Sequence, residues 1–311
     1  MTTAKTVAEH STHSSRAALA SVCIALVLLV AKGWAAYRTG STAMLGSLAD
    51  TGLDLIASAT TLAGVRIAAQ PADLDHRFGH GKAEALVALA QVALISVSAV
   101  GILWDGVRRL LHGTHTQAIG TGVTVSLLAI VLTLGLLWYQ HGVIARTGSV
   151  AIKTDNLHYR ADLALNVAVI TALFLDQSLH IAGADAIVGI AIALWLAWGA
   201  FRASGEAINQ LMDREWPEAE RQAFLDAAAE HDELRGLHDL RTRKSGTLRF
   251  VQFHVWVPAE WTVQEAHDRL DRAEEALQQR FPDTEILIHV DPEGQTDRET
   301  LLPQAITEQA K

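Results

Sequence analysis

Residues 46–59 read GSLADTGLDLIASA, an apolar stretch that nevertheless carries two acids. Asp50 and Asp54 are four positions apart, so on a helix they lie one above the other on the same face. With its flanks the stretch is long enough to cross a bilayer, where an ionised acid costs roughly 2.5–3.5 kcal/mol on the insertion scale. Because two such acids would also repel each other, we expect a cation to lie between them.

Apolar residues are concentrated in the N-terminal part of the chain. Of 311 residues, 50% are hydrophobic, and nearly all the long apolar runs lie within residues 17–203. A membrane-spanning helix needs about 20 mainly apolar residues. Six stretches meet this length: residues 17–36, 42–69, 83–107, 119–144, 149–175 and 181–201. We therefore predict a polytopic α-helical membrane protein with six transmembrane helices lying in the lipid bilayer.

Composition and missing motifs exclude several function classes. The net charge of −9 argues against nucleic acid as a partner. The single cysteine, Cys23, cannot form a disulfide within one chain. The sequence contains neither a P-loop nor HExxH, which disfavours an ATP-driven pump and a membrane metalloprotease. Lys32 and Asp105 interrupt predicted spans, and we expect each of them to snorkel or to pair with an opposite charge.

Lysine and arginine in the short loops predict how the spans are oriented. If the N-terminus lies in the cytoplasm, most of these residues fall on the cytoplasmic side: Lys5, Arg16, Arg66, Arg77, Lys82, Arg146, Lys153, Arg202 and Arg214. Arg38, Arg108 and Arg109 then fall on the opposite side. This bias favours both termini in the cytoplasm.

The pattern changes after residue 206 to that of a charged soluble domain. Amphipathic helices are predicted over residues 217–231 and 263–280, and strands over residues 237–243, 249–257 and 284–290. This α-β-β-α-β order predicts an α+β domain with helices on one face of a sheet. The predicted parts of the chain are a cytoplasmic segment, 1–15, the membrane domain, 16–206, the soluble domain, 207–292, and a flexible tail, 293–311.

A second polar pair with the same spacing lies in the fifth predicted span. If His158 and Asp162 face Asp50 and Asp54, three carboxylate oxygens and one imidazole nitrogen surround one point. Such a set completes a tetrahedral shell for zinc or a similar divalent ion and leaves no position for an activated water, which favours carriage over hydrolysis. The alternative is that these side chains pair with lysine or arginine, or line a water-filled cavity.

Charge also predicts what replaces the metal when it leaves. Three carboxylates around a divalent ion leave one excess negative charge, and without the ion they repel strongly in a low dielectric. Protons should then bind some of the four ligands, and His158 titrates most readily near neutral pH. Competition between metal and protons for one site is the chemistry of an antiporter. The imidazole favours Zn²⁺, Cd²⁺ or Fe²⁺ over Mn²⁺.

Two further sets of residues have the chemistry of metal ligands. Asp73, His76 and His80 lie in one loop, where they can share a metal at the membrane surface or simply be solvated. The soluble domain holds a second set on its predicted strands and second helix: His238, His254, His267, His289 and Asp291. His289 and Asp291 are two positions apart and share a strand face. This set is either a metal cluster or a scatter of histidines in a histidine-rich domain.

These features together resemble the cation diffusion facilitator family, and within it the bacterial zinc/ferrous-iron efflux pumps. The resemblance rests on the DxxxD of Asp50 and Asp54, the HxxxD of His158 and Asp162, and two longer strings. The strings are QPADLDHRFGHGKAEAL, residues 70–86, and HDLRTRKSG, residues 238–246. The resemblance runs from about residue 16 to residue 291, almost the whole chain.

The resemblance implies a homodimer of six-helix protomers in the bacterial inner (plasma) membrane, each with a cytoplasmic domain of ferredoxin-like, metallochaperone-like fold. It implies alternating access that exports Zn²⁺ against inward proton flow, and a charge interlock of Lys82 with Asp213 at the dimer junction. By motif match it implies three metal sites: Asp50, Asp54, His158 and Asp162 for transport; Asp73, His76 and His80 in the loop; and His238, His254, His267, His289 and Asp291 in a cytoplasmic binuclear site bridged by Asp291.

We therefore predict a proton-coupled exporter of divalent cations, with zinc first and cadmium or ferrous iron as further substrates. The chain is predicted to be a secondary transporter that uses no ATP, and not an enzyme. Two alternatives stay open at this point. One is another proton-coupled carrier, for example of organic cations, and the other is a membrane metal sensor whose soluble cluster signals while nothing crosses the membrane.

Overall fold

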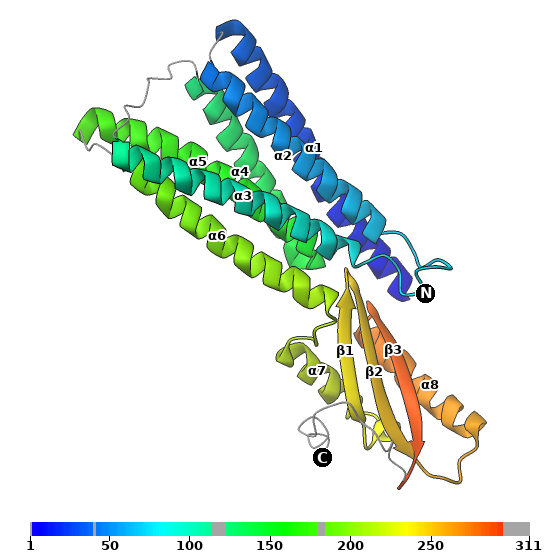
Figure 1. Cartoon of the computed structure of the whole chain (residues 1–311). Coiled ribbons are helices and arrows are strands. Elements are labelled where there is room, and N and C mark those ends of the chain that lie inside the picture. Colours follow the sequence, from blue (N-terminus) through cyan, green and yellow to red (C-terminus); the bar gives the residue numbers. More distant parts are fainter. Residues whose placement is uncertain (1, 40–41, 113–121, 180–183, 295–311) are drawn as a thin grey trace. The chain divides into compact units, whose positions relative to one another are not determined.

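The computed structural model describes residues 2–39, 42–112, 122–179 and 184–294 (Figure 1). Within these residues the chain forms two compact units, which we describe separately. One unit, Ser11–Ile208, is helical, and the other consists mainly of the chain from Asn209 onward. Of the predicted flexible tail, only Glu293 and Gly294 lie within the described residues.

The helical unit is built from long helices, each of which covers most of one predicted span. In the described residues these are α1 (Thr2–Thr39), α2 (Thr42–Ala68), α3 (Ala83–His112), α4 (Gly122–Thr147), α5 (Val150–Leu179) and α6 (Ala184–Leu211). The first residues of two predicted spans, 119–121 and 181–183, lie outside the described residues.

Four of these helices contain a stretch that is long and apolar enough to cross a membrane: Glu9–Arg38 in α1, Ala83–Leu111 in α3, Leu127–Thr147 in α4 and Ala186–Leu211 in α6. Within the described residues, α2 and α5 are not among them. In α2 the ionisable residues Asp50 and Asp54 lower the hydropathy, and the first half of α5 carries several ionisable side chains. These two helices hold the predicted transport ligands.

Helix α1 begins much earlier than the first predicted span. The sequence predicted a separate segment over residues 1–15, whereas α1 is helical from Thr2. The chain has no glycine or proline before Gly33, so nothing in its first residues breaks the helix once the apolar part has formed it.

A buried carboxylate joins α5 to three neighbouring helices. Asp155 is 0% exposed, and its Oδ2 accepts hydrogen bonds from Ser21 Oγ of α1 at 2.6 Å and Gln140 Nε2 of α4 at 2.7 Å. Its Oδ1 accepts a hydrogen bond from Gln91 Nε2 of α3 at 3.2 Å. In an apolar interior no water competes for these hydrogen bonds.

Tyr159 adds a link from α5 to α2. Its side chain is 1% exposed, and its hydroxyl donates to the carbonyl oxygen of Ser21 at 3.0 Å. The same hydroxyl lies 2.8 Å from the hydroxyl of Ser58 on α2. Because His158 directly precedes Tyr159, these bonds and those of Asp155 fix the height of His158 relative to the neighbouring helices.

The smaller unit is a three-stranded sheet with helices packed against it (Figure 1). Its elements in chain order are α7 (Glu218–Ala228), the 3₁₀ turn η1 (Asp232–Leu234), β1 (His238–Ser245), β2 (Leu248–Val257), α8 (Val263–Arg280) and β3 (Thr284–Pro292). The strand order is β1-β2-β3, with β1 antiparallel and β3 parallel to β2. The parallel pair requires a crossover, and α8 supplies it.

Both helices of this unit cover the same face of the sheet. Phe224 of α7, Leu270 of α8, and Phe253 and Val255 of β2 belong to one buried apolar cluster. Side chains alternate between the two faces along a strand. His254, which lies between Phe253 and Val255, therefore points to the face that these helices leave uncovered.

The network around Asp155 makes a prediction about stability. Substituting Asp155→Ala removes the carboxylate that accepts hydrogen bonds from Ser21, Gln91 and Gln140, at a cost of about 0.5–1.5 kcal/mol for each hydrogen bond lost. We expect a lower midpoint of thermal unfolding for the purified protein in detergent. Asp105→Ala is the control, because Asp105 is 55% exposed and pairs with Arg109 at 2.7 Å. Equal midpoints of unfolding for the two variants would show that the hydrogen bonds of Asp155 do not stabilise the helical unit.

Candidate metal centres

Three of the predicted transport ligands meet inside the helical unit. His158 Nε2 lies 3.1 Å from Asp54 Oδ1 and 3.6 Å from Asp162 Oδ2, and one ligand atom from each residue lies within 4.8 Å of the others. The spacing of four puts His158 and Asp162 on one face of α5, and α2 supplies Asp54. Two carboxylates and an imidazole are three of the four donors that a tetrahedral zinc site needs.

Asp50 stands slightly apart from this group. It lines the same cavity of about 510 Å³ as Asp54, His158 and Asp162, but it is exposed and is not one of the three residues that cluster. It lies about one helical turn before Asp54 on α2. The sequence predicted four ligands around one point; the structure brings three of them together and leaves Asp50 on the wall of the cavity.

Sequence reasoning did not assign two polar residues to this site, although both lie near it. Lys32 of α1 lines the same cavity, and Asp155 lies about one turn before His158 on α5. The available signal was that both carry charge inside an apolar helix, where an ionisable residue is rare and usually paired or functional. Spacing alone gave neither of them a partner, because their partners come from other helices.

The loop residues Asp73, His76 and His80 lie together. His76 Nδ1 is 3.2 Å from Asp73 Oδ1, and His80 Nε2 is 3.3 Å from Asp73 Oδ2. The two imidazole rings are 4.5 Å apart between centroids. Gly79 has φ of +75°, a conformation that glycine adopts readily, and its N–H donates to the carbonyl of His76 at 2.9 Å, which turns the chain back toward Asp73.

The loop holds these groups in a form that suits a cation. The hydrogen bond from the backbone N–H of His76 holds the pKa of Asp73 below its usual range, so this exposed carboxyl is ionised at neutral pH. His80 is 14% exposed, and its Nδ1 has no hydrogen-bond partner among the described residues. Two imidazoles and an ionised carboxylate form a donor set that zinc accepts.

The soluble unit gathers a third group on the uncovered face of its sheet. The register aligns His238 with His254 and His254 with His289 across the three strands. Asp291 Oδ2 lies 3.1 Å from His238 Nε2 and 2.8 Å from His254 Nδ1. Its other oxygen, Oδ1, lies 3.4 Å from His289 Nε2. One oxygen of this carboxylate therefore faces two histidines, and the other oxygen faces the third.

Neighbouring groups prepare this cluster for a metal. His238 Nδ1 lies 2.8 Å from the carbonyl oxygen of Gly236, so it is the protonated nitrogen and Nε2 is left to act as a ligand. Partial burial raises the pKa of Asp291, but the hydrogen bond from His254 and the charges of His254 and His289 outweigh it and lower the pKa overall. Gly236 has φ of +75°, and a Cβ there would come within 2.8 Å of the Trp256 ring.

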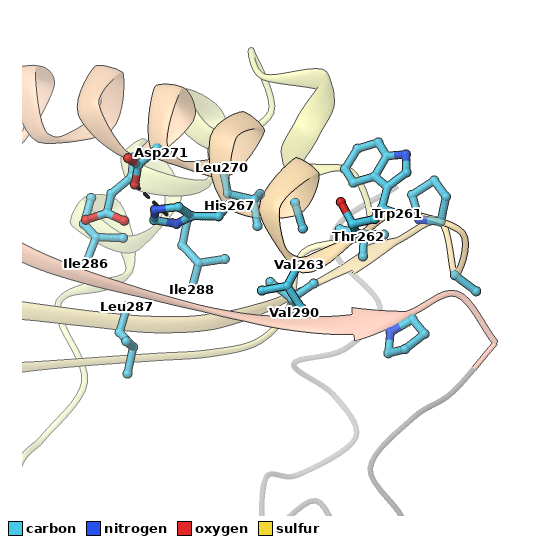
Figure 2. A pocket seen from close by; sticks show the side chains of 16 residues that line it. Trp261, Thr262, Val263, His267, Leu270, Asp271, Ile286, Leu287, Ile288 and Val290 are labelled. Carbon is cyan, nitrogen blue, oxygen red and sulfur yellow. Dashed lines mark ion pairs between the residues drawn. The ribbon is translucent and has the colours of Figure 1, made fainter.

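His267 lies apart from this cluster within a single chain. Figure 2 shows it on α8, facing Asp271 beside the strand side chains that point toward the helix. Its Nδ1 is 3.9 Å from Asp271 Oδ1, and its side chain is 71% exposed. Ile288 points toward α8, so the next residue along the strand, His289, points to the other face. The five predicted ligands thus divide into four on one face of the sheet and His267 on the other.

The predicted pair of Lys82 and Asp213 spans the two units. Lys82 belongs to the helical unit and Asp213 to the smaller one. Within its own unit, Asp213 Oδ1 lies 3.6 Å from Arg243 Nη1. The interlock between Lys82 and Asp213 therefore stays a prediction.

Two family models match consecutive parts of the chain. The model of the cation efflux transmembrane domain matches residues 18–212, and that of the cation efflux protein cytoplasmic domain matches residues 216–293. The chain belongs to the cation diffusion facilitator family. It is accordingly a multi-pass membrane protein of cation efflux, a transporter and not an enzyme.

Individual relatives resemble this family member over most of its length. The cation-efflux pump FieF of Cronobacter sakazakii is 42% identical over 279 residues, covering 89% of this chain and 92% of the relative. FieF of Salmonella newport is 40% identical over 286 residues, covering 92% of this chain and 95% of the relative. A solved structure of a transporter named CzrB, in its zinc form, is 38% identical and covers 28% of this chain and 99% of its own, with a TM-score of 0.25.

The geometry of the cytoplasmic cluster makes a prediction about bound metal. Asp291→Ala removes the carboxylate that faces three histidines, so we expect the purified full-length protein to retain fewer zinc ions per chain, measured by elemental analysis. Glu285→Ala is the matched control, because Glu285 is an exposed acid on the same face of β3. The cluster would lose its assignment if both variants kept the zinc content of the unsubstituted chain.

Proposed function

We propose that this transporter exports divalent metal ions from the cytoplasm in exchange for protons, with zinc as its main substrate and Cd²⁺ and Fe²⁺ as further ones. The observation that carries the proposal is the group of Asp54, His158 and Asp162, which faces a cavity within apolar helices of a cation efflux protein. We propose that Asp50, on the wall of the same cavity, completes the set as the fourth ligand.

The donor set supports zinc as the substrate. Three carboxylates with one imidazole match the preferences of Zn²⁺ and tolerate Cd²⁺ and Fe²⁺, whereas an all-carboxylate site would favour Mn²⁺. His158 is thus the residue that we propose to set the choice of metal. Its Nε2 points toward Asp54 and Asp162, and an ion shared by the three residues would lie between them.

Charge supports the exchange with protons. Metal ligands must be deprotonated, so metal binding releases protons and proton binding releases metal. Asp54 and Asp162 both approach His158 in the half-buried site, and without a metal their charges are best satisfied when protons bind in its place. A carrier that binds either a metal ion or protons, and crosses in both forms, couples the two flows.

Six membrane spans with alternating access are part of the proposal. Helices α2 and α5 are 27 and 30 residues long, which is enough to cross a bilayer even though their ionisable residues lower their hydropathy. Asp50, Asp54, His158 and Asp162 can be tolerated because they line the cavity. An even number of spans agrees with both termini in the cytoplasm and with an inner-membrane location.

We further propose that the chain works as a homodimer through its cytoplasmic domain, which would be a variant of the ferredoxin-like fold. The four donors on the uncovered sheet face, His238, His254, His289 and Asp291, would hold zinc there, with Asp291 bridging two ions. Since His267 lies on the opposite face of its own sheet, it can serve this site only from the second protomer. We also propose that Asp73, His76 and His80 hold a metal ion in the loop. Lys82 and Asp213 are proposed to form the charge interlock at the dimer junction.

Transport by the purified protein in lipid vesicles tests the proposal. We expect zinc uptake driven by an opposing pH gradient, and we expect Asp54→Asn or Asp162→Asn to lower it by roughly tenfold or more, the effect of losing about 1.4 kcal/mol of metal binding. Asp105→Asn is the control, since Asp105 is exposed and pairs with Arg109. The pH gradient tests the coupling to protons, and the aspartate variants test where the ion crosses.

Three outcomes would overturn parts of the proposal. Zinc flux that ignores the pH gradient would exclude the antiport mechanism. Flux that is unchanged in both aspartate variants would show that the ion crosses elsewhere. Zinc binding without any flux would favour a membrane metal sensor, the alternative that keeps the cytoplasmic cluster and gives the membrane domain no transport role.

A further inference from the structure

A lysine of the first helix faces the cavity that holds the proposed transport ligands. Lys32 lies within Glu9–Arg38 of α1, a stretch that is apolar and long enough to cross a membrane. It is half-buried and lines the cavity together with Asp50, Asp54 and Asp162. A charged lysine at such a position costs roughly 2.5–3.5 kcal/mol on the insertion scale, so its presence calls for a compensating interaction.

Hydrogen bonds hold the ammonium of Lys32 against α2. Its Nζ donates to Thr51 Oγ1 at 2.6 Å and to the carbonyl oxygen of Ser47 at 3.5 Å. Thr51 lies between Asp50 and Asp54 in sequence, so the ammonium is fixed beside the two acids of α2. Both acceptors are neutral, so the positive charge of Lys32 is left to compensate the acids that line the same cavity, including Asp162 of α5.

The charges around the cavity balance when Lys32 is counted. Asp50, Asp54 and Asp162 carry three negative charges, and His158 must be neutral to bind a metal. A divalent ion leaves one of these negative charges uncompensated, and the ammonium of Lys32 compensates it. Without Lys32, the three carboxylates would hold a dication more tightly, because at low dielectric no positive charge would offset their attraction for it.

We propose that Lys32 is a charge-balancing residue of the transport site, which weakens the binding of the dication and thereby allows its release. This inference rests on the proposed transport site and adds to it a residue from a third helix. The ammonium repels the bound dication, and when the dication leaves it remains as a partial replacement for the lost positive charge. Lys32 thus lowers the affinity of the site for the dication and speeds its release. A carrier needs this because it must release the ion that it binds.

A purely structural role is the competing explanation. In that case Lys32 would only tie α1 to α2 through its hydrogen bond to Thr51, and any residue that donates the same bond would replace it. The two explanations differ in which property of the side chain matters. Lys32→Gln keeps a hydrogen-bond donor and removes the charge, whereas Lys32→Arg keeps the charge and several donors.

Zinc binding and zinc flux by the full-length protein separate the two explanations. Binding is measured by titration calorimetry at mildly alkaline pH, in a background with Asp73→Ala and Asp291→Ala that silences the other two centres. We expect Lys32→Gln to bind zinc roughly tenfold more tightly, and in vesicles to lower both KM and kcat. Lys32→Arg should stay close to the unsubstituted chain. Lys153→Gln is the control, because Lys153 pairs with Glu206 at 2.5 Å and does not line the cavity.

Two results would overturn the role of Lys32. One is Lys32→Gln binding zinc no more tightly than the unsubstituted chain, and the other is Lys32→Arg binding as tightly as Lys32→Gln. If Lys32→Gln does not fold, Lys32→Met, which suits an apolar helix, carries the same expectation. Asp162→Asn in the same assays tests the transport site separately: if it binds zinc normally, the site itself is misassigned, whereas loss of binding with no effect of Lys32→Gln rejects only this inference.

Discussion

The helical unit depends on one constraint, which is that charge inside an apolar bundle must be compensated from within the protein. Asp155 meets it with hydrogen-bond donors from three helices. Lys32 meets it with acceptors from α2 and with the acids of the cavity. Each compensation requires helices that are distant in sequence to approach at a defined height. The polar residues inside these apolar helices therefore also specify how the bundle packs.

In the smaller unit, the positions of the polar side chains are set by a three-stranded sheet and not by the packing of apolar helices. Its proposed ligands lie on neighbouring strands, and the strand register sets their spacing. The carbonyl of Gly236 selects the tautomer of His238, and the low pKa of Asp291 keeps its carboxylate ionised. This site is preorganised by backbone geometry, whereas the membrane site is preorganised by the balance of charges.

The sequence predicted the local geometry well and the long-range geometry less well. A spacing of four on one helix was enough to predict that His158 and Asp162 share a face, and alternation predicted the same for His289 and Asp291. The separation of His267 from that cluster could not be predicted, because it depends on which face of the sheet α8 covers. The early start of α1 followed from the absence of helix breakers, which the search for apolar runs had ignored.

The position of His158 connects the two kinds of polar residue in the bundle. It lies on α5 between Asp155, whose carboxylate is bonded to α1, α3 and α4, and Asp162, which faces Asp54 of α2. Helix α5 is therefore tied to three helices by the hydrogen bonds of Asp155, and to α2 by Tyr159 and by the group that occupies the proposed site. Because we propose that the contents of that site change during transport, the contact between α2 and α5 is the one that a bound metal ion would strengthen and that its release would weaken.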